Sequence, residues 1–353
     1  MAKKQLHNIY DKSILKAKLE LENKSRTTIS FYVYAHIQHP TVFRNYLYKV
    51  LDEISVLGRI YVAKEGVNAQ ISVPDENVDQ LRVVLNKVDF LKDIRLNIAV
   101  ESEKISFLKL TVKVRAKIVA DGLEDATFDV TKKGQHVGAE KFNELLEDPK
   151  TVCVDMRNHY ESEIGHFKNA VTPDVDTFRE SLDLIEEQLR DEKDKQLLMY
   201  CTGGIRCEKA SAYFKHKGFN NVYQLEGGII KYAQDVEKDN IENKFLGKNF
   251  VFDDRMAERI SDEIIAKCHQ CETPHDVHSN CINDACHLLF LQCPECEEKH
   301  HGCCSPECHE FIQLPEEEQK AFKSGKDLGS QVFKKGRKSL FIEKYREWKK
   351  EKQ

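Results

Sequence analysis

Cys201-Thr202-Gly203-Gly204-Ile205-Arg206 is the stretch from which the fold of this chain can be predicted. An apolar run at residues 197–200 precedes it and predicts a buried strand, and a helix-like stretch that contains Ala210 and Phe214 follows it. A strand, a glycine loop and a helix in this order place Cys201 at the carboxyl edge of an α/β sheet, where such folds build their sites.

The same loop predicts a nucleophilic sulfur. Gly203 and Gly204 allow the backbone to curl with its N–H groups turned inward, while the helix N-terminus and Arg206 add positive charge. All three favour a thiolate over a thiol. The alternative is a buried structural cysteine beside a glycine turn, but the ordered set of Cys, Gly-Gly and Arg favours the reactive interpretation. We therefore expect Cys201 and Arg206 to be catalytic, with Thr202, Gly203, Gly204 and Ile205 forming the active-site loop.

The motif Cys201-x4-Arg206 resembles the active-site loop of rhodanese-type domains. Residues 152–157, with Glu161 and residues 165–170, resemble the opening signature of that family, and residues 225–229 resemble the closing one. Phosphatase loops related to this fold carry one more residue between Cys and Arg. The shorter loop at 201–206 therefore implies a pocket for a sulfur atom rather than for a phosphate.

The sequence also predicts roles for three further residues of this region. Asp155 and Arg157 follow the predicted strand at 152–154, and we expect them to support neighbouring loops by a charge-assisted pair. Cys207 follows Arg206 and could resolve a disulfide or persulfide with Cys201. We predict instead that helical geometry turns Cys207 away from the loop.

Length and composition limit the class of protein. The 353 residues suggest two or three domains, and 41% hydrophobic with 32% charged residues indicate a soluble globular protein. No apolar run is long enough to cross a membrane, and the first residues lack an apolar signal core. These features predict a cytoplasmic protein with no membrane partner.

Residues 1–120 predict a ferredoxin-like domain. Strands are expected at 29–35, 59–63, 69–73 and 95–99, with helices opening at Pro40 and Asp75, and residues 1–25 form a polar lead-in. The order βαββαβ is typical of that fold. The whole chain is therefore expected to be a multidomain α/β protein, with a rhodanese-like catalytic domain at 121–245 and a cysteine-rich region with a basic tail at 246–353.

A strand predicted at 108–118 alternates strictly between apolar and basic residues. Its basic face could be an edge protected against aggregation. It could also contact the backbone of RNA. The candidate RNA-binding residues are Lys109, Lys113, Arg115 and Lys117.

Nine of the twelve cysteines lie between Cys268 and Cys308. Pairs of cysteines separated by two residues are typical of zinc sites, and four successive pairs suggest two sites in a cross-brace. Disulfides or free thiols in a small core are the alternative. One zinc would take Cys268, Cys271, Cys293 and Cys296, and the other would take Cys281, Cys286 and two of Cys303, Cys304 and Cys308, of which Cys303 and Cys308 are the predicted ligands. His287 or His301 could substitute.

The C-terminal end is strongly basic. Residues 320–353 hold twelve Lys or Arg against four acidic residues, although the whole chain has a net charge of −5. Phe341, Tyr345 and Trp348 are interleaved with these cations. Aromatic rings among cations suit RNA, on whose bases they stack, and they also suit an ordinary amphipathic helix.

The three regions together resemble the tRNA uridine hydroxylases. The resemblance rests on residues 64–68 (Lys-Glu-Gly-Val-Asn) in the first domain, the loop at 201–206 and the cysteine-rich segment. It implies oxygen-dependent hydroxylation of the wobble uridine, U34, of certain tRNAs to 5-hydroxyuridine, with tRNA as partner and Cys201 as the essential thiol.

The residues alone leave other functions open. The sequence contains no haem, flavin, NAD or facial-triad iron signature. It therefore indicates neither how oxygen would be activated nor which electron donor would be used. The first alternative is a sulfurtransferase that carries a persulfide on Cys201 to an RNA or a small molecule. The second is a non-catalytic module that binds RNA or protein.

Overall fold

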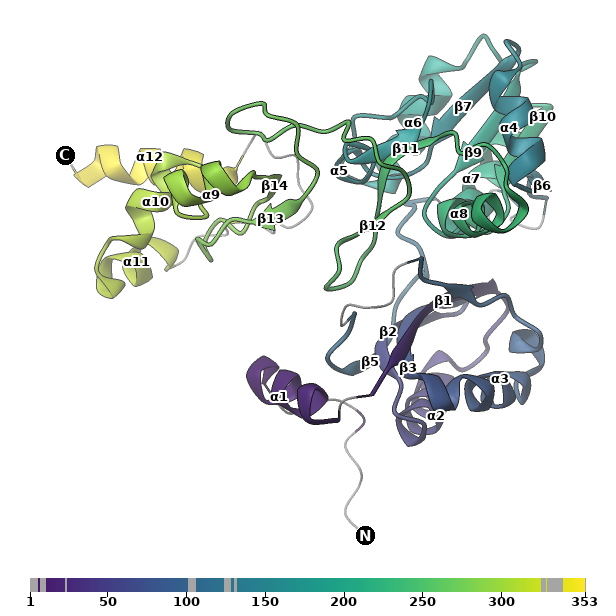
Figure 1. Cartoon of the computed structure of the whole chain (residues 1–353), viewed down its shortest axis with the longest axis horizontal. Helices are drawn as coiled ribbons and strands as arrows, with labels where there is room; N and C mark the ends of the chain where they lie inside the picture. Colours follow the sequence, from purple (N-terminus) through teal and green to yellow (C-terminus); the bar gives the residue numbers. More distant parts are fainter. Residues whose placement is uncertain are drawn as a thin grey trace.

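The structure is a computed structural model that describes residues 6, 11–22, 24–100, 106–123, 128–129, 132–324, 328 and 339–352. Figure 1 shows an N-terminal sheet with its helices, a central α/β unit and a C-terminal unit that projects to one side. The predicted multidomain α/β architecture, with an N-terminal α+β domain, a central α/β unit and a cysteine-rich end, is confirmed. The predicted division at residues 120 and 245 stays a prediction.

The N-terminal sheet has five strands, in the order β4-β1-β3-β2-β5. They are β1 (Arg26–Tyr34), β2 (Leu57–Ala63), β3 (Gly66–Pro74), β4 (Asn97–Ile98) and β5 (Leu110–Val114). All pairs are antiparallel except β2 with β5. Its helices are α1 (Lys12–Glu22), α2 (Pro40–Glu53) and α3 (Val78–Asn86), with short 3-10 turns at Asp75–Asn77 and Asp89–Leu91.

The two faces of this sheet differ in chemistry because successive side chains of a strand point to opposite faces. One face packs against α2 and α3 and forms the core, with Ile29, Phe31, Ile60, Ala69 and Ile71 among its buried members. The other face is polar and aromatic, and it carries Ser30, Tyr32, Arg59, Tyr61, Asn68 and Gln70.

The central unit is a parallel sheet covered on both faces. Its strands β6 (Gln135–Val137), β7 (Thr151–Asp155), β9 (Gln196–Tyr200) and β10 (Asn221–Leu225) run in the order β6-β10-β9-β7. Helices α6 (Phe178–Gln188) and α7 (Ile205–His216) cover one face, and α4 (Ala139–Glu147) and α8 (Gly228–Asp239) cover the other. The carboxyl end of β9 therefore lies at the centre of the sheet edge.

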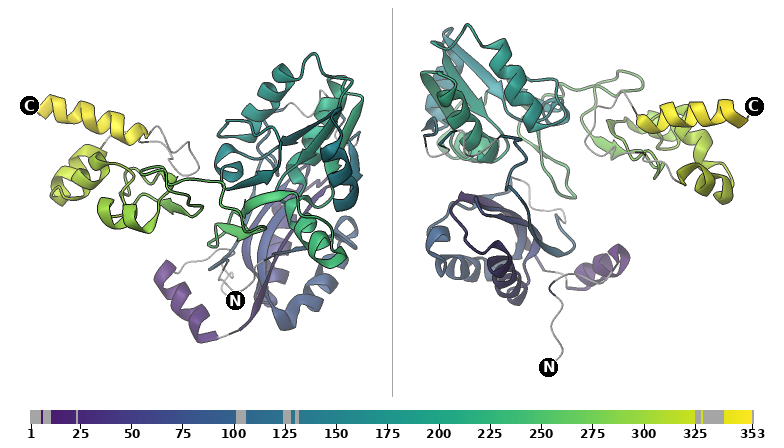
Figure 2. Two further views of the ribbon diagram at one scale, coloured as in Figure 1. Left: turned by 45° about the horizontal axis from the view of Figure 1, so that its top comes forward. Right: turned by 180° about the vertical axis from the view of Figure 1, so that it is seen from behind.

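Smaller elements join the central unit to the C-terminal unit (Figure 2). Beside the short helix α5 (His159–Ser162), β11 (Phe245–Phe250) pairs with both β8 (Gly165–Phe167) and β12 (Ala257–Arg259). The C-terminal unit holds β13 (His278–Asn280), β14 (Leu289–Leu291), α9 (Pro294–His300), α10 (Pro306–Ile312), α11 (Glu316–Lys323) and α12 (Leu340–Lys352). Among the described residues, no helix is long and apolar enough to cross a membrane.

Two sequence predictions for the N-terminal part need correction. The strand expected at 108–118 is shorter, because β5 ends at Val114 and the chain turns away until the Ile118 N–H donates to Glu65 Oε1 at 2.7 Å. Residues 12–22, expected as part of a loose lead-in, form helix α1.

Candidate functional site

The loop between β9 and α7 wraps around the sulfur of Cys201. The N–H of Gly204 donates to Cys201 Sγ at 3.2 Å, and Gly204 adopts φ +96° where α7 begins. A Cβ on Gly204 would lie 2.8 Å from Tyr32 Oη, and one on Gly228 would lie 2.5 Å from the Cys201 carbonyl oxygen. Glycine is therefore required at both positions, and the closing motif at 225–229 packs directly on the loop.

Cys201 is buried but holds a thiolate readily. Burial alone would raise the pKa of this thiol, but a hydrogen bond from Cys207, the charge of Arg206 and nearby backbone N–H groups lower the pKa of Cys201 to about 6. At neutral pH the sulfur is therefore mostly ionised.

The prediction that Cys207 turns away from Cys201 is wrong. The Cys207 thiol hydrogen-bonds to Cys201, and burial together with this contact raises the pKa of Cys207. Helical spacing did not apply to this pair, because Cys201 precedes the left-handed Gly204 and so lies outside the helix.

Arg206 is held by a carboxylate that comes from another element. Its Nη1 and Nη2 donate to Glu161 Oε1 and Oε2 of α5 at 2.6 and 2.8 Å, and Thr202 Oγ1 lies 3.4 Å from both Arg206 Nη2 and Glu161 Oε2. Such a bidentate pair fixes the guanidinium plane. The pair leaves Arg206 charged beside Cys201, with its guanidinium over the ring of Phe252 at 6.0 Å.

Asp155 and Arg157 form a second buried pair close to the loop. Arg157 Nε and Nη2 donate to Asp155 Oδ1 and Oδ2 at 2.9 and 2.6 Å, and both side chains are fully buried. Nη2 of Arg157 also donates to the Gly165 carbonyl at 2.6 Å. The pair thus ties the end of β7 to β8, beneath the segment that carries Glu161.

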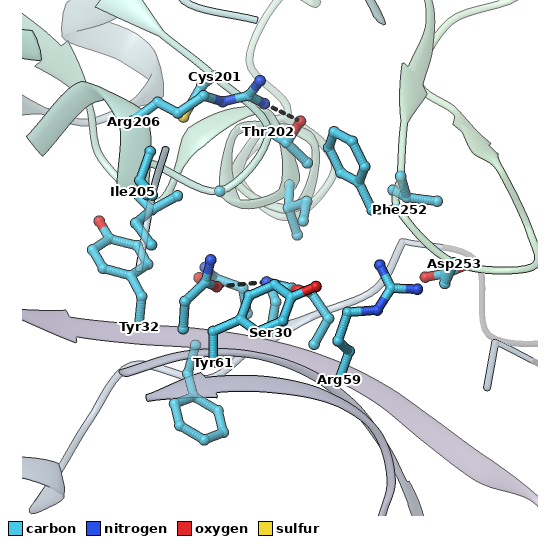
Figure 3. A pocket seen from close by; sticks show the side chains of 18 of the residues that line it. Ser30, Tyr32, Arg59, Tyr61, Cys201, Thr202, Ile205, Arg206, Phe252 and Asp253 are labelled. Carbon is cyan, nitrogen blue, oxygen red and sulfur yellow. Dashed lines mark hydrogen bonds between the residues drawn. The ribbon is translucent and has the colours of Figure 1, made fainter. Parts of the chain in front are cut away.

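Cys201, itself fully buried, lies in the wall of a cavity of about 440 Å³. The loop residues Thr202, Ile205 and Arg206 form one wall, and the polar face of the N-terminal sheet forms the opposite wall. Figure 3 shows Ser30, Tyr32, Arg59 and Tyr61 rising from the sheet toward the loop, with Phe252 and Asp253 closing the side. The volume is in the range of pockets that bind small molecules.

The sequence analysis missed this wall. Residues 28–34, 59–63 and 66–72 alternate in the same way as the basic strand, but apart from Arg59 their outward residues are uncharged, so these strands gave little charge signal. The signal that could have found them is the period of two itself, applied to each predicted strand.

Of the four predicted RNA-binding residues, three are exposed and one is paired within the chain. Lys109 and Lys113 are exposed and line a cavity of about 990 Å³ that also contains Lys16 and Arg59. Arg115 is exposed and lies over the Tyr61 ring at 5.3 Å. Lys117 differs, because it is partly buried and its Nζ pairs with Asp121 Oδ1 at 2.7 Å. Lys117 therefore contacts its own chain and does not belong to the basic face.

Eight cysteines gather in two groups, and one prediction needs correction. Cys268, Cys271, Cys293 and Cys296 form the first group, and their sulfur atoms lie within 4.8 Å of one another. The second group contains Cys281, Cys286, Cys304 and Cys308. Cys304 thus takes the place predicted for Cys303, because Cys304 Sγ lies 3.6 and 3.7 Å from the sulfurs of Cys286 and Cys308.

The aromatic residues of the basic tail are structural. Phe341 and Tyr345 of α12 are buried against Phe311 and Phe322, so their rings belong to the core of the C-terminal unit. This favours the amphipathic-helix interpretation over base stacking. Most of residues 325–338, which contribute five of the basic side chains, lies outside the described residues.

Family models match three parts of the chain. Residues 26–118 match the UPF0176 acylphosphatase like domain, residues 138–235 match the rhodanese-like domain, and residues 246–309 match the model described as rhodanase C-terminal.

Curated relatives match almost the whole chain. A tRNA uridine(34) hydroxylase of Photorhabdus laumondii is 53% identical over 95% of this chain and 96% of its own length. Proteins of the same name from Leptospira interrogans and Pectobacterium carotovorum are 52% and 53% identical, over 95% and 94% of this chain and 91% and 94% of their own lengths.

Proposed function

The chain belongs to the tRNA uridine(34) hydroxylase family, and we propose that it hydroxylates U34 of tRNA at C5 with the Cys201 thiolate as the reacting group. One observation carries the role of Cys201. Its thiol has a pKa of about 6, and Cys201 lies in the wall of a cavity whose far side carries aromatic rings and carboxamides. Rings and amides are the groups that recognise an unstacked base.

The chemistry follows from placing a thiolate beside a uracil. Cys201 Sγ forms a bond to C6, and the electron pair of the C5–C6 double bond moves onto C5 and O4. C5 then attacks an oxygen atom derived from O2, and loss of the C5 proton with expulsion of the thiolate restores the double bond. The balance is uridine, O2, two protons and two electrons from a reductant, giving 5-hydroxyuridine and water.

The residues around Cys201 suit its two roles as nucleophile and leaving group. The Gly204 N–H and the Arg206 charge stabilise the thiolate that attacks and is later expelled. Glu161 and Thr202 hold Arg206 in place. A pKa near the working pH lets the sulfur both add and leave without a separate base.

Transfer of sulfur is the second candidate. A loop with inward N–H groups and a thiolate could hold a persulfide, and rhodanese-like domains share this loop. The cavity argues for a larger substrate, because 440 Å³ lined by Tyr61, Asn68 and Gln70 far exceeds the space that a single sulfur atom requires.

The test is the nucleoside content of tRNA. Total tRNA from cells with the intact gene, without it, and with Cys201→Ala is digested and analysed by mass spectrometry. We expect 5-hydroxyuridine-type nucleosides to disappear in both defective strains, while Cys153→Ala, which alters another buried cysteine, retains them. Survival of the modification in Cys201→Ala would exclude the thiolate mechanism. Loss of a thiolated nucleoside instead would establish sulfur transfer.

We also propose that Lys109 and Lys113 bind phosphates that flank U34. Their cavity shares Arg59, Phe252 and Asp253 with the cavity at Cys201, so a strand of RNA could pass from one to the other. Replacing both lysines by glutamine should lower the slope of log affinity against log salt by about 1.5, since each phosphate contact contributes roughly 0.7–0.9. Lys49→Gln/Lys87→Gln, on the helix side of the domain, should leave the slope unchanged. An unchanged slope in the first variant would contradict this path.

We further propose that each cysteine group binds one zinc ion. Tetrahedral zinc with Zn–S bonds of ~2.3 Å places its sulfur ligands ~3.8 Å apart. The sulfur–sulfur separations of 3.6 Å (Cys271–Cys293 and Cys286–Cys304) and 3.7 Å (Cys304–Cys308) fit this arrangement, and all twelve cysteines are free thiols. When bound, zinc would crosslink the small C-terminal core.

Adjacent cysteines offer a matched test of this assignment. Elemental analysis of the purified chain should find two zinc ions. Cys304→Ala should retain one, whereas Cys303→Ala should retain both, although the two positions are neighbours in sequence. If Cys303→Ala loses a zinc ion and Cys304→Ala keeps both, Cys303 is the ligand, as the sequence predicted. If the unaltered chain holds no zinc, the proposal that the cysteine groups bind zinc is excluded.

A further inference from the structure

The polar face of the N-terminal sheet is ordered in rows across its strands. Asn97, Ser30, Gln70 and Arg59 are direct neighbours in one row across β4, β1, β3 and β2. Tyr32, Asn68 and Tyr61 form the adjacent row. All seven line the cavity beside the Cys201 loop, and Figure 3 labels Ser30, Tyr32, Arg59 and Tyr61 among them. A base that reaches Cys201 must therefore lie against these rows.

One hydrogen-bonded chain fixes the orientation of two amides in this wall. Asn68 Nδ2 donates to the carbonyl oxygen of Ile118 at 3.1 Å, and a carbonyl can only accept. Asn68 Oδ1 must therefore face the other way, where it accepts from Gln70 Nε2 at 2.6 Å. The orientation of the Gln70 amide follows from these two bonds and is not arbitrary.

These two hydrogen bonds leave the side-chain oxygen of Gln70 available to accept a hydrogen bond from a ligand. Among the residues that the structure describes, no donor bonds Gln70 Oε1, and the side chain is partly exposed on the cavity wall. The wall thus presents an acceptor that cannot become a donor without the loss of one of these two hydrogen bonds. Each such bond contributes roughly 1 kcal/mol to the preference for this orientation.

We propose that Gln70 Oε1 selects uracil over cytosine by accepting a hydrogen bond from N3–H of the base, an assignment that rests on the proposed hydroxylation of U34. Uracil carries a proton on N3, whereas cytosine has a lone pair there. An acceptor facing N3 therefore bonds uracil and repels cytosine. Asn68 is a positioning residue that prevents the amide of Gln70 from turning over to accommodate cytosine.

Binding measurements test this selection without any turnover. The probes are anticodon stem-loop RNAs with uridine, cytidine or N3-methyluridine at the wobble position, titrated with the full chain in the absence of oxygen. The unaltered chain should prefer uridine over both other bases by about tenfold, the effect of one buried hydrogen bond. N3-methyluridine isolates the N3 proton because it leaves O2 and O4 unchanged.

Three variants separate the roles. Gln70→Met keeps the size of the side chain and should bind the three RNAs with similar, weaker affinity. Asn68→Leu frees the Gln70 amide, so the cytidine loop should bind better than it does to the unaltered chain. A general loss of structure would not produce that gain. Gln188→Met, at an exposed glutamine on α6, should keep the full preference.

The outcomes distinguish this inference from the proposed function. If the unaltered chain binds uridine and N3-methyluridine loops equally, or if Gln70→Met keeps the preference, Gln70 does not read N3–H, and hydroxylation by Cys201 is unaffected. If none of the loops binds, both the inference and the proposed function are overturned. If the preference is found but tRNA from cells lacking the gene keeps its 5-hydroxyuridine, only the proposed reaction fails.

Discussion

Cys201 has a low pKa because of groups that lie within six residues of it in the sequence. Burial opposes ionisation, while the Cys207 thiol, the Arg206 guanidinium and N–H groups at the start of α7 outweigh it. The pKa is about 6, against roughly 8.5 for an ordinary thiol. The thiolate is therefore the major form above pH 6, and the thiol is the major form below it.

This pKa predicts the pH dependence of alkylation. The rate at which iodoacetamide modifies Cys201 should rise with pH through a midpoint near 6, measured by mass spectrometry of the peptide that contains it. In Arg206→Met combined with Glu161→Gln, the midpoint should move up by about one pH unit or more, because the cation is lost without leaving a buried carboxylate unpaired.

Two comparisons control that experiment. Glu161→Gln alone retains the Arg206 charge, so its midpoint should stay below that of the double variant. Cys153, buried in β7 with a raised pKa, should react only at higher pH. A midpoint that is the same in the double variant and the unaltered chain would show that Arg206 does not set the ionisation of Cys201.

At the residue scale, the sequence predicted what neighbours along the chain determine. Cys201, Arg206 and the glycine turn are local, and so is the pair of Asp155 and Arg157. Glu161 was part of a family signature, but its hold on Arg206 joins residues 45 positions apart and required the fold. The exchange of Cys303 for Cys304 arises because spacing alone cannot tell which of two adjacent side chains faces the metal group.

At the scale of elements, helix α7 holds the N-terminal sheet in place. Lys209 Nζ of α7 pairs with Glu65 Oε2, in the turn between β2 and β3, at 2.7 Å and with Asp121 Oδ2 at 2.5 Å. The side chain of Lys209 is 1% exposed. The same helix begins at the Cys201 loop, so this cluster fixes the distance between the sulfur and the opposite wall of the cavity.

Lys209→Met should therefore weaken both stability and activity. Removing one partner of a buried ionic cluster costs about 3–5 kcal/mol, because Asp121 is left buried with less compensation. Urea unfolding should show this loss in the free energy of unfolding. Lys215→Met, on the exposed side of α7, should change it by less than about 0.5 kcal/mol. Equal stability of the two variants would mean that the cluster does not couple sheet and helix.

Periodicity predicted most elements of the N-terminal part, but not their pairing. The strands at 29–35, 59–63 and 69–73 correspond to β1, β2 and β3, because alternation of buried and exposed residues marks each strand by itself. The rows that place Gln70 beside Ser30 and Arg59 depend on register, which long-range packing determines. The cavity wall therefore became visible only in the fold.

At the scale of the whole molecule, α5 connects the active-site loop with the C-terminal unit. Glu161 binds Arg206 on one side, and on the other side Glu163 Oε1 pairs with His269 Nε2 at 2.7 Å. Tyr160 packs into a cluster that includes Leu289 and Leu291 of β14. Only four residues long, α5 depends on these contacts for its order, because isolated helices of this length are unstable.

Removal of the proposed zinc ions should therefore loosen α5 as well as the C-terminal unit. A chelator is expected to raise amide hydrogen exchange in residues 159–163 about tenfold, a loss of roughly 1.4 kcal/mol of local stability, while β1–β3 remain protected. His269→Ala with metal bound should give a smaller increase, because the apolar contacts of Tyr160 persist. If chelation exposes the C-terminal amides and leaves α5 protected, the C-terminal unit does not support the site. Slower alkylation of Cys201 after chelation would show that the loss of order reaches Arg206 through Glu161.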